Sequence, residues 1–391
     1  MVILKIALSF SVLLAKKNIL LALAYQRLSS IHFSGNQFPD NLKAHMIQLS
    51  TTSVESYPSS SDWKVQLSQS KMTSAELLSY LKLDEHPLVD PEAEKLFELR
   101  VPEAYLNKIK KGDPTDPLLL QILPQNKEFL EVPGFSDNPL DEGKYNPVRG
   151  LFHKYENRVL LIASSTCAIN CRYCFRRTFP YDEHRQSRSD WQEALDYIRS
   201  NKQIDEVIFS GGDPLIQTNQ SLLWLLSEVD SIKHITRIRI HTRMLTSLPD
   251  RLDEELYIGL KALKTSLVIV THCNHPNELG SDLLPIFKKL KLANITLLNQ
   301  SVLLKDINND ASILSELSKK LFHLGILPYY LFLLDPVAGS AHFEVSDYDA
   351  KRLYKELQAK LPGYLVPRLS KEEPGNTSKT LVNLIIEDRK Q

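Results

Sequence analysis

The sequence predicts an α/β fold: an open, partial (β/α)6 barrel of the TIM type, preceded by a helical region and followed by a short carboxyl-terminal segment. Six runs rich in apolar and β-branched residues occur at 159–163, 206–209, 235–240, 266–270, 295–298 and 327–333. Amphipathic stretches separate these runs, and such an alternation favours a parallel sheet covered by helices. Six units suit an open barrel better than a closed barrel of eight strands. A doubly wound sheet is the alternative, because periodicity does not show whether a sheet closes.

The stretches between the predicted strands have the periodicity of surface helices. The expected helices cover residues 189–199, 221–229, 250–263, 283–292 and 311–324. Upstream of the first strand, residues 46–150 are predicted to form short helices with proline-rich joints. Ser74 is a candidate N-cap, and Pro91 suits the first turn of a helix, where no N–H is needed.

These patterns divide the chain into four parts. Residues 1–45 form an amino-terminal extension, 46–150 the helical region, 151–345 the barrel core, and 346–391 a helix followed by a turn-rich segment. The extension has five basic residues and one acidic residue, and its apolar run at 6–15 is too short to span a bilayer. We expect the folded protein to begin near Met46, with the extension as an addition upstream of it.

The composition is that of an ordinary globular protein with no net charge. The 391 residues include 47 basic and 47 acidic side chains, so no global positive field would attract nucleic acid. Free cysteines grouped around a metal centre require a reducing compartment. We therefore expect a cytoplasmic protein without a nucleic-acid or membrane partner.

Three of the four cysteines, Cys167, Cys171 and Cys174, lie within eight residues. Thiolates at such short loop spacings hold iron–sulfur clusters, and three of them leave one iron open to a substrate or cofactor. A structural zinc site needs four ligands, commonly two cysteine pairs, and the chain has no second pair. A zinc site that borrows a distant histidine and cysteines that are merely buried are the alternatives. A disulfide framework does not suit three cysteines in so long a chain.

Polar residues follow every predicted strand at its carboxyl end. The groups are 167–174, 210–214, 241–243, 271–275, 299–301 and 335–336. The carboxyl ends of parallel strands meet at one edge of the sheet, where (β/α) barrels carry their active sites. The sequence therefore predicts a single active site at this edge.

The cysteine motif resembles the signature of radical S-adenosylmethionine (SAM) enzymes. It reads Cys167-x-x-x-Cys171-x-Tyr173-Cys174. The resemblance implies a 4Fe-4S cluster held by the three cysteines, with SAM bound to the fourth iron. The following Phe-Arg-Arg at 175–177 resembles the lysine 2,3-aminomutase group, and Phe-Pro-Tyr at 179–181 resembles its branch that makes (R)-β-lysine for modification of elongation factor P.

The resemblance also implies which residues bind the cofactors. Those that match the family's SAM-binding positions are Gly211, Gly212, Asp213, His272 and Gln300. Lys379 matches the lysine that forms a Schiff base with pyridoxal phosphate, and an amine on a desolvated lysine is readily deprotonated for that reaction. Lys154 and Arg158 are the candidates for the phosphate of pyridoxal phosphate, with Lys154 in place of an arginine of the family.

The same register implies how L-lysine is bound. Arg176 matches the arginine that binds the substrate carboxylate, for which the planar guanidinium fork is well suited. Asp335 and Glu372 match the carboxylates that bind the ε-ammonium, and Glu372 replaces an aspartate of the family.

The resemblance as a whole implies an isomerase, an L-lysine 2,3-aminomutase. A flavodoxin or ferredoxin would supply electrons, and a β-lysine ligase would transfer the product to elongation factor P. Because no cysteine follows Cys273, the carboxyl-terminal zinc site of catabolic lysine aminomutases is not expected. The alternatives are a catabolic free-lysine mutase, a radical SAM enzyme acting on protein or RNA without pyridoxal phosphate, and a non-catalytic zinc-binding module.

Overall fold

A computed structural model describes residues 62–83, 89–179 and 187–385. Residues 61–391 group by their contacts into one compact unit. The expected amino-terminal extension lies outside the described residues, as do Pro180 and Tyr181 of the branch-specific motif. The divisions expected at residues 46, 150 and 345 stay predictions.

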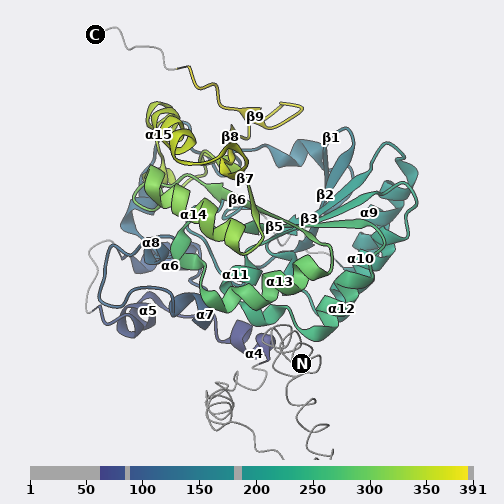
Figure 1. Ribbon diagram of the computed structural model, residues 1–391, viewed down its shortest axis with the longest axis horizontal. Helices are drawn as coiled ribbons and strands as arrows, with labels where there is room; N and C mark the ends of the chain where they lie inside the picture. The colour runs from purple at the N-terminus through teal and green to yellow at the C-terminus, as the bar shows by residue number, and fades with distance from the viewer. Residues whose placement is uncertain (1–61, 84–88, 180–186, 386–391) are drawn as a thin grey trace, which may run out of the picture. The chain divides into compact units, whose positions relative to one another are not determined.

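The core of this unit is a nine-stranded sheet in which each strand pairs with its neighbours in sequence (Figure 1). The strands are β1 Leu151–Tyr155, β2 Arg158–Ser164, β3 Glu206–Gly211, β4 Arg237–Thr242, β5 Ser266–His272, β6 Thr296–Val302, β7 Leu327–Phe332, β8 Arg368–Lys371 and β9 Thr380–Leu381. Strands β2 to β8 are parallel, whereas β1 and β9 pair antiparallel at the two edges. The six predicted strands are confirmed as β2 to β7, and the sheet is an open, partial barrel.

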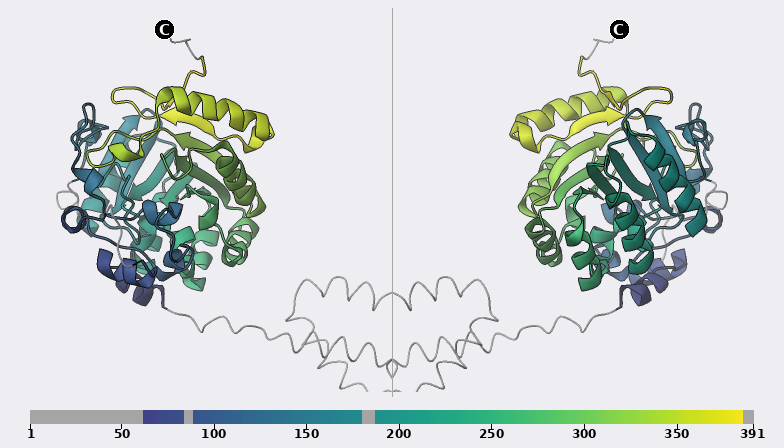
Figure 2. Two further views of the ribbon diagram at one scale, coloured as in Figure 1. Left: turned by 90° about the vertical axis from the view of Figure 1, so that its left-hand side faces the viewer. Right: turned by 90° about the vertical axis from the view of Figure 1, so that its right-hand side faces the viewer.

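Helices cover the outer face of the strands (Figure 2). They are α9 Arg188–Ser200, α10 Asn219–Asp230, α12 Glu254–Ala262, α13 Leu284–Leu292, α14 Ala311–His323 and α15 Asp347–Lys360. The apolar faces of α9 to α14 pack on the strands in a large buried core that includes Trp191, Leu225 and Phe287. The apolar face of α15 packs in a separate core with residues of β7 and β8. The helix expected over 250–263 is divided, because Asp253 caps α12 by accepting the N–H of Leu256, after the 3-10 turn η4 Pro249–Arg251.

The region before the barrel is built from short helices with their own apolar core. The helices are α4 Trp63–Ser68, α5 Ser74–Tyr80, α6 Pro91–Leu96, α7 Glu103–Leu106 and α8 Pro117–Leu120, with 3-10 turns η1 Asn126–Phe129 and η2 Glu142–Tyr145. Thr73, not Ser74, is the N-cap of α5, since its hydroxyl and Glu76 form a reciprocal capping box. Pro91 is the first residue of α6, as predicted.

The remaining short elements lie in loops around the barrel. They are η3 Pro214–Ile216, α11 Met244–Ser247, η5 Pro276–Glu278, η6 Ser281–Leu283, η7 Ala341–Phe343 and η8 Gly363–Leu365. Within the described part of the chain, every helix is too short or too polar to cross a membrane.

The helical region holds the cysteine loop in place. Ile169 of the loop packs in the core of that region, and the Asn170 N–H donates to the carbonyl of Arg100 at 3.0 Å. Arg172 is fully buried and donates from Nε to Glu128 Oε1 at 2.8 Å, while Arg177 donates to the same carboxylate. A guanidinium that is buried away from solvent needs an anionic partner, so Glu128 restricts the position of the cysteine loop.

Candidate active site

A cavity of about 870 Å3 runs along the inside of the barrel and is lined by every residue to which the sequence assigned a site role. Side chains alternate along strands, and every second residue of β3 and β4 lines the cavity, with Ile208 as the apolar member of the β3 set. The polar members are Glu206 and Ser210 on β3, and Arg237, Arg239 and His241 on β4. Glu206 and Arg237 begin their strands, so the cavity extends from the carboxyl edge of the sheet, where we expected the site, to its amino edge.

The three clustered cysteines lie half-buried in the loop after β2, and all four cysteines are free thiols. Burial raises the pKa of Cys167, and burial followed by the neighbouring Cys171 raises that of Cys174 to about 11. Iron binding at this loop must therefore release protons, because the thiolate is the ligand. No group of three His, Cys, Asp or Glu side chains among the described residues is arranged around a single metal ion. A cluster puts each cysteine on a different iron, which separates the sulfurs more widely than ligands of one ion.

The glycine pair after β3 allows the chain to pass directly beside the cysteine loop. A Cβ on Gly212 would lie 2.2 Å from the carbonyl oxygen of Thr166, and Gly211 has a φ of +113°. The N–H groups of Gly212 and Asp213 donate to the carbonyls of Ser164 and Thr166, both at 2.8 Å. The glycines are thus needed for backbone packing just before Cys167, a contact between two loops that the sequence pattern did not indicate.

The Asp213 carboxylate is fully engaged within the protein. It accepts the hydroxyl of Thr242 at 2.8 Å and the N–H groups of Leu215, Arg243 and Met244 at 2.8–3.0 Å. Asp213 therefore joins the loops after β3 and β4. Gly211 and Gly212 of this motif line the cavity, although the Gly212 N–H and the Gly211 carbonyl already have partners within the protein.

Two histidines present unpartnered ring nitrogens to the cavity. Nε2 of His272 and Nε2 of His241 are buried and have no hydrogen-bond partner among the described residues. Burial, reinforced by Arg243 and Arg176, lowers the pKa of His272 to about 3, so its ring is neutral. Gln300 pairs in register with His272 on the adjacent strand. Buried polar atoms are normally satisfied, and these fit a bound cofactor that carries polar groups.

Arg176 projects into the cavity and is held by an acid that the sequence analysis did not identify. Its Nε and Nη2 donate to the two carboxylate oxygens of Glu142 at 3.0 and 2.7 Å, and Nη1 lies 3.3 Å from Ser210 Oγ. This bidentate pairing shows that the Arg176 guanidinium, in its present position, can bind a carboxylate.

Glu372 lies between the two lysines that were assigned to pyridoxal phosphate. Its Oε1 accepts from Lys154 Nζ and from the Tyr155 hydroxyl, both at 2.6 Å, and its Oε2 accepts from Lys379 Nζ at 2.9 Å. Burial alone would raise the pKa of Glu372, but Lys379 and these hydrogen bonds outweigh it and lower the pKa to about 2. The ammonium of Lys379 also lies 4.3 Å from the centre of the Phe332 ring. Arg158 stacks at 4.0 Å over the ring of Tyr155.

Asp335 lines the cavity without a hydrogen-bond or ion-pair partner for its carboxylate among the described residues. Burial raises its pKa to about 7, with Lys379 acting in the opposite direction and Glu372 adding to the rise. A half-buried carboxylate that lines a cavity and lacks a partner is ready to receive a cation.

Several residues of the cavity were not foreseen as functional. His241 lies at the carboxyl end of β4 and Arg243 follows the strand. Both belong to the polar group 241–243 that was expected at the active-site edge, although neither was given a role. Tyr155 lies between the candidates Lys154 and Arg158, so its position was also a usable signal. Glu142 offered none, because it reaches the cavity from the helical region before the barrel.

Comparisons with known proteins agree with the resemblance. A family model of the radical SAM superfamily matches residues 161–311. The L-lysine 2,3-aminomutase of Haemophilus influenzae is 51% identical over 289 residues, 74% of this chain and 86% of that protein. The L-lysine 2,3-aminomutase of Escherichia coli is 45% identical over 343 residues, 87% of this chain and 98% of that protein. The L-lysine 2,3-aminomutase of Buchnera aphidicola is 44% identical over 325 residues, 83% and 96% of the two chains.

Gly212→Ala is expected to weaken iron binding by about tenfold or more, because displacing groups that support metal ligands has effects of this size. The added methyl group would press on Thr166, the residue before Cys167. Iron and sulfide bound per chain after anaerobic reconstitution measure the effect. Gly363→Ala is the control, since a Cβ there has open space around it. Equal iron in both variants would contradict this use of the glycine.

Proposed function

The chain belongs to the lysine 2,3-aminomutase family of radical SAM enzymes, and we propose that it converts L-lysine to (R)-β-lysine. It is an isomerase of this family. The observation that supports the substrate best is that Arg176 and Asp335 line the same cavity as Lys379 and the cysteine loop. One end of lysine is a carboxylate and the other an ammonium, and these two side chains have the complementary charges.

The residues present fit the cofactors of the family. Cys167, Cys171 and Cys174 would hold the 4Fe-4S cluster, and His272 and Gln300 would contact SAM. Lys379 would hold pyridoxal phosphate, with Lys154 and Arg158 near its phosphate. When bound, the cluster and SAM supply a carbon-centred radical that abstracts hydrogen, and pyridoxal phosphate supplies the conjugated carrier through which the amino group moves.

Glu372 is proposed to exchange partners as the site fills. It now forms ion pairs with both Lys154 and Lys379. A phosphate group would compete for Lys154, and Lys379 must lose a proton before its amine can react with an aldehyde. Both events release the carboxylate of Glu372, which then becomes available, together with Asp335, for the ε-ammonium of the substrate. Arg176 binds at the other end, and the buried walls keep water away from the reacting atoms.

The destination of the product is a proposal that rests on the sequence resemblance. The branch of the family suggested by residues 179–181 supplies (R)-β-lysine to a ligase that modifies elongation factor P. An external protein such as flavodoxin or ferredoxin would provide the electron. A catabolic free-lysine mutase is the competing assignment.

Anaerobic incubation of the reconstituted protein with L-lysine, SAM, pyridoxal phosphate and dithionite should yield (R)-β-lysine, identified by chiral chromatography. Borohydride treatment should leave a stable pyridoxyl group on Lys379 in the peptide map. Lys379→Ala should lose both, whereas Lys371→Ala should keep them, because Lys371 pairs with Glu373 at the surface. A protein that holds its cluster and cleaves SAM, yet traps no pyridoxyl group, would contradict the mutase assignment.

Asp335 should impose a pH dependence on substrate use. Only its ionised form attracts the ε-ammonium, so kcat/KM for lysine should rise about tenfold from about pH 6 to about pH 8, as does the ionised fraction of a group with a pKa of about 7. Asp335→Asn should lower kcat/KM and abolish this rise. A rise that persists in the variant would assign the titration to another group.

The same residue should affect the stability of the cofactor-free protein. Its folded-state pKa lies above the unfolded value of about 3.9, so its ionisation opposes folding increasingly above that pH and to a constant extent above about pH 7. Asp335→Asn should therefore melt at a higher temperature than the unsubstituted protein at about pH 8, and the difference should vanish near about pH 4.

Glu142→Gln should lower KM for lysine by about three- to tenfold, because a charge-assisted hydrogen bond that competes with the substrate carboxylate is weakened. The kcat should change little. Asp141→Asn removes the same charge next to it, from a residue that pairs with the exposed Lys144, and should leave KM unchanged. A higher KM in Glu142→Gln would show that Glu142 orients Arg176 instead of competing with the substrate.

A further inference from the structure

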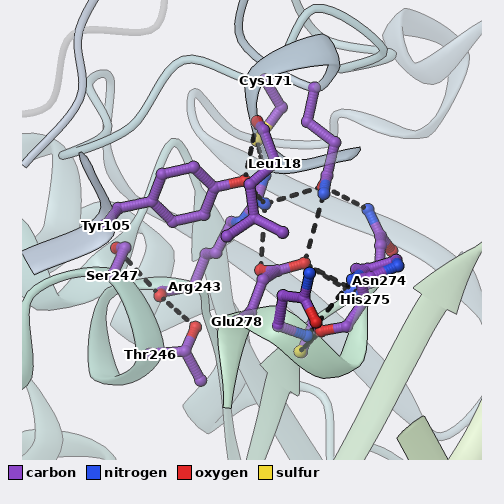
Figure 3. Close-up of polar contacts among 12 residues, drawn as sticks. Tyr105, Leu118, Cys171, Arg243, Thr246, Ser247, Asn274, His275 and Glu278 are labelled. Carbon is purple, nitrogen blue, oxygen red and sulfur yellow. Dashed lines mark hydrogen bonds and ion pairs between the residues drawn. The ribbon is translucent and has the colours of Figure 1, made fainter. Parts of the chain in front are cut away.

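Arg243 makes direct contact with one of the clustered cysteines (Figure 3). It follows β4, is 5% exposed, and its Nη1 donates to Cys171 Sγ at 2.6 Å and to the Tyr173 hydroxyl at 2.7 Å. Its Nη2 donates to Gln121 Oε1 at 2.8 Å and to Glu278 Oε2 at 3.0 Å. The role of this guanidinium is not explained by the binding of lysine or pyridoxal phosphate.

The surrounding residues hold Arg243 at a fixed distance from the sulfur. Its N–H donates to the Asp213 carboxylate at 2.8 Å, and its carbonyl accepts the hydroxyls of Thr246 and Ser247 at 2.9 and 3.0 Å. The Tyr105 hydroxyl, from the helical region, accepts from Nη2 at 3.2 Å. Few rotamers remain open to a side chain fixed at both its backbone and its guanidinium, so the contact with Cys171 is preorganised.

The negative charge of Glu278 offsets only part of the positive charge that Arg243 places beside the Cys171 sulfur. Its side chain is fully buried and also accepts the N–H groups of Asn274 and His275 at 2.9 and 3.0 Å. Once Cys171 binds iron as a thiolate, the guanidinium faces two anions, one on Glu278 and one on the sulfur. Arg243 stays positive throughout, because a guanidinium keeps its proton at all accessible pH values.

We propose that Arg243 is a positioning residue that raises the reduction potential of the iron–sulfur cluster through its hydrogen bond to Cys171. This inference rests on the proposed function only in taking the cluster to be bound by Cys167, Cys171 and Cys174. Reduction adds one electron from a one-electron donor, without a proton, and increases the negative charge on the cluster and its sulfur ligands. A cationic donor at one sulfur stabilises the reduced form, and such hydrogen bonds are a main determinant of cluster potentials.

Glu278 should act in the opposite direction. Its negative charge offsets part of the field of Arg243 at the sulfur. Removing the arginine should therefore lower the potential, whereas removing the glutamate charge should raise it. Loss of a merely structural ion pair would not produce shifts of opposite sign, because both substitutions would disturb the same packing.

The test is a potentiometric titration of the reconstituted protein without SAM, followed by the electron paramagnetic resonance signal of the reduced cluster. Arg243→Gln should make reduction at least tenfold less favourable, a shift of about 59 mV to lower potential for one electron. Arg243→Lys keeps the charge but not the fork, and should give a smaller shift. Glu278→Gln should shift the potential upward.

Arg239→Gln is the matched control. Arg239 lies on β4, the strand just before Arg243, lines the same cavity and pairs with Glu206 through Nε at 3.0 Å. If the reduction potential depends on contact with the sulfur and not on the net charge of the cavity, Arg239→Gln should leave the potential unchanged. Two measurements separate electrostatic effects from loss of structure. They are the iron content of each reconstituted variant and the melting temperature of each variant without cofactors.

Each outcome decides between the proposals. If the unsubstituted protein binds no cluster, the proposed function fails. If the cluster binds normally and Arg243→Gln leaves its potential unchanged, the inference about Arg243 is overturned while the proposed function stands. If neither Arg243→Gln nor Glu278→Gln retains iron, the ion pair is structural and the inference is again overturned. Normal potentials with weaker SAM binding in Arg243→Gln would assign the residue to SAM recognition instead.

Discussion

Buried arginine–glutamate pairs determine where the cysteine loop lies. Residues 165–179 contain no helix or strand, so the loop cannot be positioned by regular hydrogen bonding. Glu128 binds both Arg172 and Arg177, and Glu278 binds Arg243. Removing one partner of a buried pair typically costs about 3–5 kcal/mol, because the other charge stays buried. The helical region before the barrel, which supplies Glu128, is therefore part of the active site.

The open side of the barrel is bridged by side chains instead of backbone. Strand β1 carries Lys154 and Tyr155, and Glu372 follows β8 near the other edge of the sheet. Their mutual hydrogen bonds join two segments more than two hundred residues apart in sequence. Backbone pairing would close the barrel permanently, whereas a carboxylate can exchange one ammonium for another. The same residues can thus hold the site together and admit a phosphate and a substrate.

Local pattern predicted the fold well and the site only in part. The six strands β2 to β7 have apolar, β-branched runs, so their positions could be predicted. Strands β1 and β8 include the polar residues His153, Lys154 and Arg368, and they form by pairing at the ends of the parallel sheet, β1 with the adjacent β2 and β8 with β7. The spacing of the three clustered cysteines predicts an iron–sulfur site without any other information. The pairing of Glu142 with Arg176 and of Glu372 with two lysines depends on how remote segments meet, which periodicity does not encode. Asp213 illustrates the same limit. Its motif was recognised in the sequence, but its carboxylate is occupied by hydrogen bonds within the protein.

An arginine at position 243 combines two properties that this site uses: a permanent positive charge and several hydrogen-bond donors. A histidine there could lose its charge within the physiological range, and a lysine offers a point charge that cannot span several acceptors. The guanidinium contacts Cys171, Tyr173, Gln121 and Glu278 at once, so one side chain connects the cluster loop, the helical region and the barrel. Movement of the helical region would alter the hydrogen bond to the sulfur. On the proposed role of Arg243, folding of that region and the ease of reducing the cluster would be coupled through this residue.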